Sequence, residues 1–136
     1  MEITIYVGVK APIEAIWDCF TLPEHITGWN FASDDWYAPE AENDLRAGGE
    51  FIYTMAAKDG SMSFEFSGIY TEVYIYKQIN YLLSDGRRVQ VNFQTAVDEI
   101  LITQTFEAEN ENPVEMQEAG WQAILNNFKN YVERLV

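Results

Sequence analysis

The sequence predicts an α+β domain in which a curved, six-stranded antiparallel sheet wraps around a long C-terminal helix, with two short helices after the first strand. Residues 50–107 alternate apolar and polar side chains between tight turns, which is typical of antiparallel strands joined by hairpins. Residues 113–135 instead repeat apolar side chains every three or four positions, which is typical of a helix with one buried face. Because this helix must bury its apolar stripe on the sheet, we expect residues 1–136 to form one domain.

The N-terminal part of the chain begins with one strand and two short helices. Residues 3–9 place apolar side chains on one face and predict the first strand, and residues 11–20 predict a helix that starts at a proline. Thr21 and Glu24 have the spacing of a capping box, which predicts a second, shorter helix. Residues 29–47 are interpreted as an irregular acidic loop, whose aromatic rings either cover the core or guard an entrance.

Five further strands are predicted by alternation, at residues 50–57, 62–76, 78–83, 87–97 and 100–107. Asp59-Gly60 and Asp85-Gly86 are strong signals for tight turns between them. Gly68 interrupts the apolar face of its strand and indicates a bend or bulge of the kind that curves a sheet. A curved sheet can leave a cavity between itself and the final helix, and this cavity is where we expect the function.

The final helix has a clear start and two neighbouring stripes. Asn112 is a good N-cap, Pro113 suits the first helical position, and Glu115 sits where a capping box places an acid. The main apolar stripe contains Trp121, Ile124, Leu125, Phe128, Tyr131, Val132 and Leu135, and the stripe beside it contains Met116, Gly120, Ala123 and Asn127. A glycine inside a helix costs roughly 0.5–1 kcal/mol relative to alanine, so Gly120 indicates a steric need. Close contact with the sheet and space for a ligand both explain it.

Composition excludes several classes of partner. With 22 acidic and 8 basic residues the formal charge is −14, which repels nucleic acid and anionic lipid headgroups. The acidic surface either serves solubility alone or attracts a basic protein. We expect neither a secretory signal nor membrane insertion, because no apolar run is long enough. A monomer in the reducing cytoplasm is therefore the expectation, with a single buried cysteine, Cys19.

The sequence offers little for catalysis or for a cofactor. It contains one histidine and one cysteine and no metal-binding motif, so we expect no metal and no cofactor. Gly48-Gly49 precedes a strand rather than a helix, which disfavours a nucleotide site. No serine has the surroundings of a nucleophile. His25 is interpreted as a surface or capping residue rather than a general base.

Short motifs in a fixed order carry a family resemblance over most of the chain. They are Ala11-Pro12 with Ile16-Trp17, Gly28–Ser33 with Asp35-Trp36, Asp44–Gly49, Lys58–Ser61, Gly68–Tyr70 and Gln117–Phe128. The chain thereby resembles the START-like (SRPBCC, helix-grip) superfamily and, within it, the branch named after the activator of heat-shock protein 90 ATPase. The resemblance implies a curved sheet that grips the C-terminal helix. The superfamily includes Bet v 1-type allergens, lipid-transfer START domains and polyketide cyclases, and it offers no shared catalytic residues to carry over.

The candidate ligand site combines inward-facing strand residues with the facing side of the helix. Its predicted members are Trp17, Trp36, Phe51, Tyr53, Met55, Phe64, Phe66, Tyr70, Val91, Phe93, Gln104, Met116, Gly120, Trp121 and Ile124. Polar members such as Tyr53, Tyr70 and Gln104 are either core groups satisfied by backbone atoms or groups that orient a ligand.

Three functions follow as hypotheses. The first is a binding module for a small hydrophobic or aromatic molecule, without catalysis. The second, implied by the resemblance, is a polyketide-cyclase-like enzyme that positions its substrate and transfers protons through one or two polar groups. The third, implied by the name of the branch, is a protein-interaction domain that stimulates a chaperone ATPase.

Overall fold

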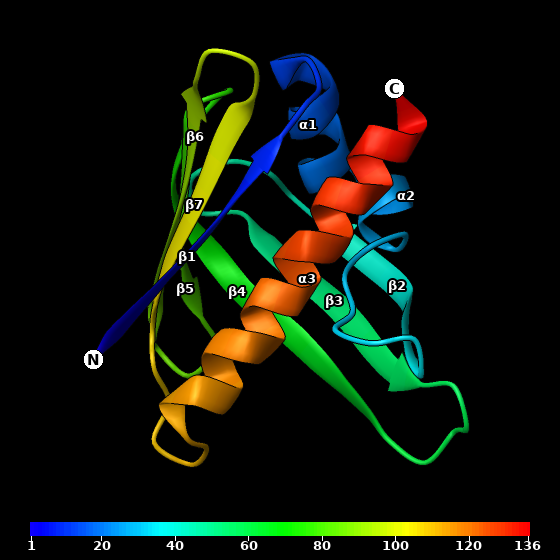
Figure 1. The fold of residues 1–136 in the computed structure, drawn as a ribbon. Coiled ribbons are helices and arrows are strands. Elements are labelled where there is room, and N and C mark those ends of the chain that lie inside the picture. Colours follow the sequence, from blue (N-terminus) through cyan, green and yellow to red (C-terminus); the bar gives the residue numbers. More distant parts are fainter.

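The computed structural model describes residues 1–136 as one antiparallel sheet with three helices (Figure 1). The strands are β1 (Glu2–Val9), β2 (Trp36–Asn43), β3 (Glu50–Ala57), β4 (Ser63–Tyr74), β5 (Gln78–Leu83), β6 (Arg88–Thr95) and β7 (Ile100–Glu107), and the helices are α1 (Ile13–Thr21), α2 (Pro23–Ile26) and α3 (Val114–Leu135). The strand order is β1-β7-β6-β5-β4-β3-β2. The predicted α+β helix-grip fold is confirmed, but the sheet has seven strands and not six.

The additional strand is β2, which lies in the stretch interpreted above as an irregular loop. It pairs with β3, and its register shifts between Tyr37 and Glu40. Only Ala38 is fully buried along it, so the sequence shows no alternation. Proline and acidic side chains are tolerated here because β2 is an edge strand with one free side. Apolar–polar alternation is weak in such an edge strand, because a strand paired on one side only needs few buried side chains.

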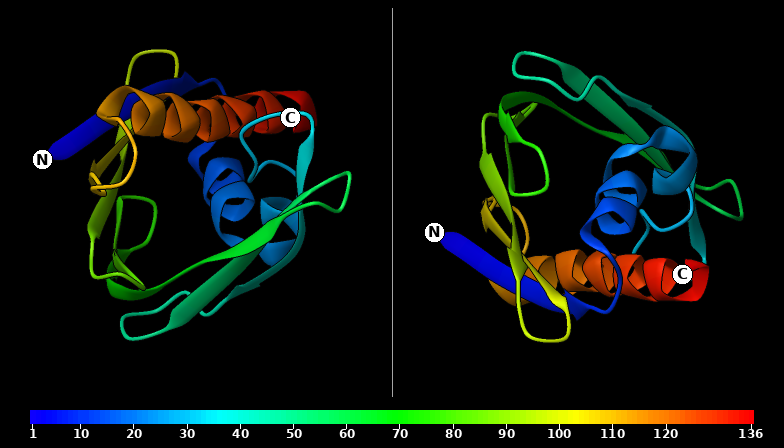
Figure 2. Two further views of the ribbon diagram at one scale, coloured as in Figure 1. Left: turned by 90° about the horizontal axis from the view of Figure 1, so that it is seen from below. Right: turned by 90° about the horizontal axis from the view of Figure 1, so that it is seen from above.

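The sheet curls around α3 (Figure 2). The long helix lies across the opening between the two edge strands, with β1 beside it, and α1 and α2 occupy one end of the enclosed interior. Within β4 the pairing with β5 shifts between Tyr70 and Glu72, which marks an irregularity that bends the strand. None of the three helices contains an apolar stretch that could cross a bilayer.

The predicted bulge at Gly68 is therefore displaced along β4. Gly68 itself pairs regularly with Phe51 on one side and with Leu83 on the other. A Cβ atom at this position would collide with the carbonyl oxygen of Leu82 and lie 2.9 Å from the ring of Phe51. The glycine is needed for close approach of a backbone and an aromatic ring rather than for a bulge.

The start of α3 also differs from the prediction. Pro113 is the N-cap and has no side-chain hydrogen bond, so Asn112 and Glu115 form no capping box. Instead the side chain of Gln117 folds back onto the preceding loop. Its Oε1 accepts from the backbone N–H of Glu109 at 2.9 Å, and its Nε2 donates to the carbonyl of Asn112 at 2.8 Å. A buried glutamine thus ties the helix start to the end of β7.

The capping box predicted at Thr21 and Glu24 is likewise absent. Thr21 donates from its hydroxyl to the carbonyl of Trp17 at 2.7 Å, and Leu22 is the N-cap of α2. The hydroxyl of Thr21 therefore bonds within the last turn of α1 and does not cap the start of α2.

The core lies between the sheet and the helices. On α3 the ring of Trp121 stacks on Phe106 of β7, with centroids 4.0 Å apart and planes at 10°. Further along, Phe128 packs edge-on against Phe20 at 5.2 Å and Trp29 at 4.8 Å. These contacts fix α3 over the sheet at two levels.

Candidate functional site

A cavity of about 330 Å³ lies between the inner face of the sheet and α3. Of its 22 lining residues, 14 are hydrophobic, so the walls favour an apolar occupant. The sheet contributes Phe51, Tyr53, Met55, Phe64, Phe66, Tyr70, Ile79, Tyr81 and Gln104, and α3 contributes Met116, Gln117, Gly120, Trp121 and Ile124. The remaining lining residues come from α1 and from loops: Phe20, Thr21, Trp29, Asn30, Ala32, Arg87, Glu109 and Asn112.

Gly120 faces open space in this cavity. A Cβ atom built on it meets no heavy atom within 4 Å, so no close packing against the sheet requires a glycine there. The sequence left two explanations for Gly120 open, close contact with the sheet or open space beside the helix. The structure agrees with open space.

The end of the cavity near α1 is held by hydrogen bonds and stacked rings. Trp29 donates from its indole nitrogen to the carbonyl of Cys19 at 2.8 Å, and its ring stacks on Phe20 with centroids 5.4 Å apart. Asn30 is only 6% exposed, yet its Nδ2 makes no hydrogen bond. A buried amide without a partner costs about 1–3 kcal/mol, so Asn30 is a polar group with unused capacity beside the cavity.

Three tyrosines gather around Phe51 on the sheet wall. The rings of Tyr53, Tyr70 and Tyr81 lie 5.0, 5.3 and 5.0 Å from it. Tyr70 donates its hydroxyl to the Oδ1 of Asn43 at 2.5 Å, whereas the Tyr81 hydroxyl makes no hydrogen bond within the protein. Burial raises the pKa of Tyr70 to about 12 and holds the pKa values of Tyr53 and Tyr81 well above their usual range. All three hydroxyls are therefore protonated near neutral pH; Tyr70 donates to Asn43, and the hydroxyl of Tyr81 is available to donate to a ligand.

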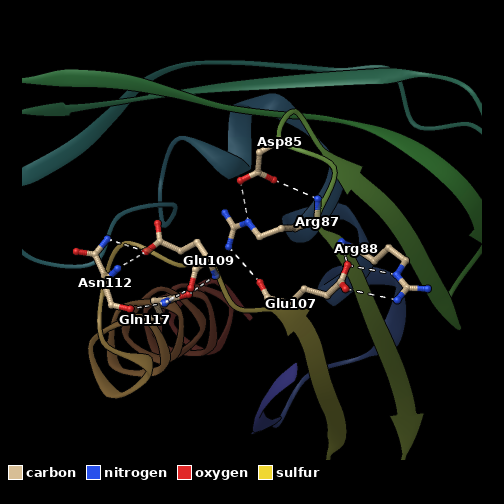
Figure 3. A network of polar contacts seen from close by, with 7 residues as sticks. All are labelled: Asp85, Arg87, Arg88, Glu107, Glu109, Asn112 and Gln117. Carbon is tan, nitrogen blue, oxygen red and sulfur yellow. Dashed lines mark hydrogen bonds and ion pairs between the residues drawn. The ribbon is translucent and has the colours of Figure 1, made fainter. Parts of the chain in front are cut away.

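The other end of the cavity carries polar groups, shown in Figure 3, and we define this polar rim as Arg87, Glu109, Asn112 and Gln117. The Nε of Arg87 donates to Asp85 at 2.8 Å, and its Nη1 donates to the carbonyl of Glu107 at 3.1 Å. The Oε1 of Glu109 accepts from the backbone N–H of Asn112 at 2.7 Å and from its Nδ2 at 2.9 Å. The only two charged lining residues, Arg87 and Glu109, thus both belong to this rim.

The structure brings eleven of the fifteen predicted site residues to the cavity wall. They are Phe51, Tyr53, Met55, Phe64, Phe66, Tyr70, Gln104, Met116, Gly120, Trp121 and Ile124. That these residues bind a ligand stays a prediction.

The other four lie outside the lining. Trp17 of α1 packs edge-on against Phe93 at 5.3 Å, and Val91 is fully buried in the same core, so these three fill the interior under α1. Trp36 lies on the edge strand β2, and its ring packs against that of Phe64 with centroids 5.7 Å apart. The inward direction of Val91 and Phe93 was predicted correctly, but α1 covers this part of the sheet.

Sequence reasoning also missed residues that line the cavity. For Tyr81 and Ile79 a signal was present, because both lie on the inward face of an alternating strand. For Trp29 and Asn30 there was none, since a loop has no period that assigns direction. Arg87 follows Gly86 in a tight turn, where the direction of a side chain depends on the turn geometry and not on alternation.

Neither His25 nor Cys19 belongs to the cavity. The Nδ1 of His25 hydrogen-bonds to the hydroxyl of Tyr131 at 2.8 Å, so His25 joins α2 to α3 instead of capping a helix. Cys19 is buried as expected, and burial raises the pKa of its thiol, which keeps the thiol protonated. No three His, Cys, Asp or Glu side chains converge as a metal site would require.

Comparison with known proteins places this architecture in a family. The solution structure of an AHSA1-like protein from Aeromonas hydrophila is 41% identical, covers 99% of this chain and 94% of its own, and superposes with a TM-score of 0.94. A protein from Cytophaga hutchinsonii is 48% identical over 98% of this chain and 93% of its own, with a TM-score of 0.84. The Aha1 dimer from Colwellia psychrerythraea, at 15% identity, shares the fold over 98% of this chain and 96% of its own, with a TM-score of 0.74.

No curated protein matches the sequence. The family model described as "Activator of Hsp90 ATPase homolog 1-like protein" matches residues 10–133, which is nearly the whole chain. The protein therefore belongs to this family, the branch of the SRPBCC superfamily to which its sequence motifs pointed.

Proposed function

We propose that this protein binds a small, predominantly apolar molecule, aromatic or aliphatic, between the sheet and α3 and releases it unchanged. The observation that carries the proposal is the cavity of about 330 Å³ with its largely hydrophobic lining. Its volume falls in the range of small-molecule sites, which is roughly 300–1,000 Å³. A fully packed core would need no such space, because protein interiors leave few voids larger than a water molecule.

The apolar walls supply enough free energy for useful affinity. Burying about 250 Å² of apolar ligand surface at about 25 cal/mol per Å² contributes roughly 6 kcal/mol. This corresponds to a dissociation constant of some tens of micromolar, before the cost of ordering the ligand and the gain from hydrogen bonds. Donors in the wall, such as the free hydroxyl of Tyr81, add orientation.

The tyrosines of the cavity wall are poor candidates for a general base. The hydroxyls of Tyr53, Tyr70 and Tyr81 keep their protons far above neutral pH, because burial raises their pKa values. They can donate hydrogen bonds to a ligand oxygen, but they do not remove a proton from it at pH 7. The alternative of a polyketide-cyclase-like enzyme would require steady turnover of a polyketide-like substrate.

A chaperone-related role is the second alternative, and the family description favours it. If this role applied, addition of the protein to an Hsp90-type chaperone would raise its rate of ATP hydrolysis. We expect no such stimulation.

The binding proposal is tested by a screen of apolar aromatic and aliphatic molecules. A ligand at a hundred times its dissociation constant stabilises the fold by about 2.7 kcal/mol and raises the melting temperature. The fluorescence of Trp29 and Trp121, which both line the cavity, should change at the same concentrations. If a broad library produces neither a thermal shift nor chemical-shift changes in residues of the wall, the proposal is wrong.

A further inference from the structure

We propose that the molecule bound in the cavity is an organic monoanion, an apolar body that carries one carboxylate, and that Arg87 on the polar rim binds this carboxylate. The inference rests on the proposed function, because it names the chemistry of the molecule that fills the same cavity. It comes from the position of Arg87, from its hydrogen bonds and from the charges around it.

Arg87 is the only cationic residue among the 22 that line the cavity. Its side chain is only 22% exposed, so most of it is withdrawn from solvent. Two hydrogen bonds hold it: Nε donates to Asp85, and Nη1 donates to the carbonyl of Glu107. Nη2 makes no hydrogen bond within the protein, and in Figure 3 the end of the guanidinium points away from Asp85, toward the side of the rim where Glu109 lies. An oriented guanidinium with free N–H groups is a ready partner for a carboxylate.

The acidic groups around Arg87 leave this end of the guanidinium free. Glu107 pairs through its carboxylate with Arg88, at 3.2 Å, and offers Arg87 only its backbone carbonyl. The Oε1 of Glu109 accepts from two N–H groups of Asn112, and Glu109 forms no ion pair with Arg87. Asp85 accepts from the Nε of Arg87 at 2.8 Å and from its backbone N–H at 3.1 Å, and it makes no hydrogen bond with Nη1 or Nη2. The remaining negative charge of the protein is screened beyond about 8 Å at physiological ionic strength.

The layout of the cavity matches a molecule with one charged end. Nine aromatic rings line it, and its two charged residues both sit at the polar rim. An apolar tail would lie along the aromatic wall, because it makes no hydrogen bonds to water that it would lose there. The carboxylate would stay at the rim, where it exchanges water for charge-assisted hydrogen bonds from Arg87. Glu109, beside it, would disfavour a second negative charge and so selects a monoanion.

Three matched probes test this assignment: octanoate, octan-1-ol and octylammonium. They share one chain length and differ in the charge of the head, which is negative, neutral or positive at pH 7. We expect octanoate to bind most tightly to the wild-type protein in calorimetric titrations. Substitution Arg87→Gln should weaken octanoate on the order of 10- to 100-fold, which is typical for loss of a hydrogen bond to a charged group.

A neighbouring arginine provides the control. Arg88→Gln removes the same formal charge, but the Arg88 side chain is 74% exposed and pairs with Glu107 outside the cavity lining, so octanoate should bind that variant as it binds the wild type. Octan-1-ol should bind all three proteins equally, which also shows that Arg87→Gln leaves the cavity intact. In the wild type, octanoate should shift the guanidinium NMR signals of Arg87 and octan-1-ol should not, a readout that needs no variant.

The outcomes separate the two proposals. If octan-1-ol or octylammonium binds the wild type at least as tightly as octanoate, or if octanoate leaves the Arg87 signals unmoved, the carboxylate assignment is overturned while the binding function stands. A preference for octylammonium would identify Glu109 as the partner instead. If none of the three probes binds, and the wider screen also fails, the binding function itself is refuted.

Discussion

Substitution of Gly120 by alanine tests whether α3 borders empty space. Gly120 lies within α3, and a Cβ atom at this position has no heavy-atom neighbour within 4 Å. The added methyl group therefore meets no steric resistance. Its effect reduces to the helix propensity of the two residues, because alanine restricts the unfolded backbone more than glycine does.

The expected gain is about 0.8–1 kcal/mol in the free energy of unfolding. The entropy of unfolding is about 2.1 cal/mol/K per residue near 60 °C, which gives roughly 0.29 kcal/mol/K for this chain. The melting temperature should therefore rise by about 3 °C. Urea melts and thermal scans by circular dichroism both resolve a change of this size.

The variant Gly120→Leu tests whether the open space beside Gly120 is the space that a ligand fills. A leucine side chain fits where nothing now lies, and at about 0.8 kcal/mol per buried CH₂ its partial burial should add about 1–2 kcal/mol of stability. It should also abolish binding of octanoate and octan-1-ol, because it occupies their volume. Ala119→Leu is the control, since residue 119 is exposed on the same helix and should leave both affinities unchanged.

Either of two results would contradict open ligand space beside Gly120. A Gly120→Ala variant that loses 1 kcal/mol or more would mean that α3 sits closer to the sheet than the structure places it, because only overpacking costs that much. A Gly120→Leu variant that is stable and still binds both probes at wild-type affinity would place the ligand elsewhere.

Three further substitutions or conditions have definite expected signs. Gly68→Ala should destabilise the fold by about 1–3 kcal/mol in urea melts, because its Cβ collides with a neighbouring backbone carbonyl; an unchanged midpoint would contradict the close approach. Asn30→Leu should stabilise the ligand-free protein by about 1 kcal/mol or more, since it removes an unpartnered buried amide; a loss of stability would show that the amide has a partner. The folded pKa of Tyr70, about 12 against an unfolded value near 10, gives stability that is present below pH 10 and lost as pH rises through about 12. About 2–3 kcal/mol should disappear over that window for Tyr70 alone, with Tyr53 and Tyr81 adding loss in the same direction; urea melts across the window measure it, and a flat profile would contradict it.

Most strands could be predicted because a buried face and an exposed face impose alternation. The bounds of β3, β5 and β7 match the prediction to the residue. Edge strand β2 was not predicted because only one of its side chains is fully buried, so its sequence shows no apolar–polar alternation. The capping contacts at the helix starts were misjudged for a related reason: residues such as Asn112 and Thr21 have several possible partners, and tertiary contacts decide among them.

The cavity was harder to predict than the sheet, because alternation tells which side chains point inward but not what covers them. Val91 and Phe93 point inward as predicted, yet they are core residues, since the rings of Trp17 and Phe20 on α1 fill the space above this part of the sheet. Where α1 ends, the same inner face continues with Phe51 and the tyrosines around it, and there the space stays open.

The position of α1 therefore decides where the cavity lies, and with it which chain segments form the polar rim. Because α1 and α2 occupy one end of the interior, the polar rim forms at the other, from the turn before β6 and the loop after β7. Residues in such connections are oriented by local turn geometry and by a few hydrogen bonds, as Arg87 is by Asp85 and Glu107. The chemistry of the polar rim consequently rests largely on residues whose direction no periodic signal records. If Arg87 binds a carboxylate as proposed, a substitution at residue 87 or 109 should alter the head group that is recognised while leaving the apolar walls intact, so the same sheet and helix could serve different ligands.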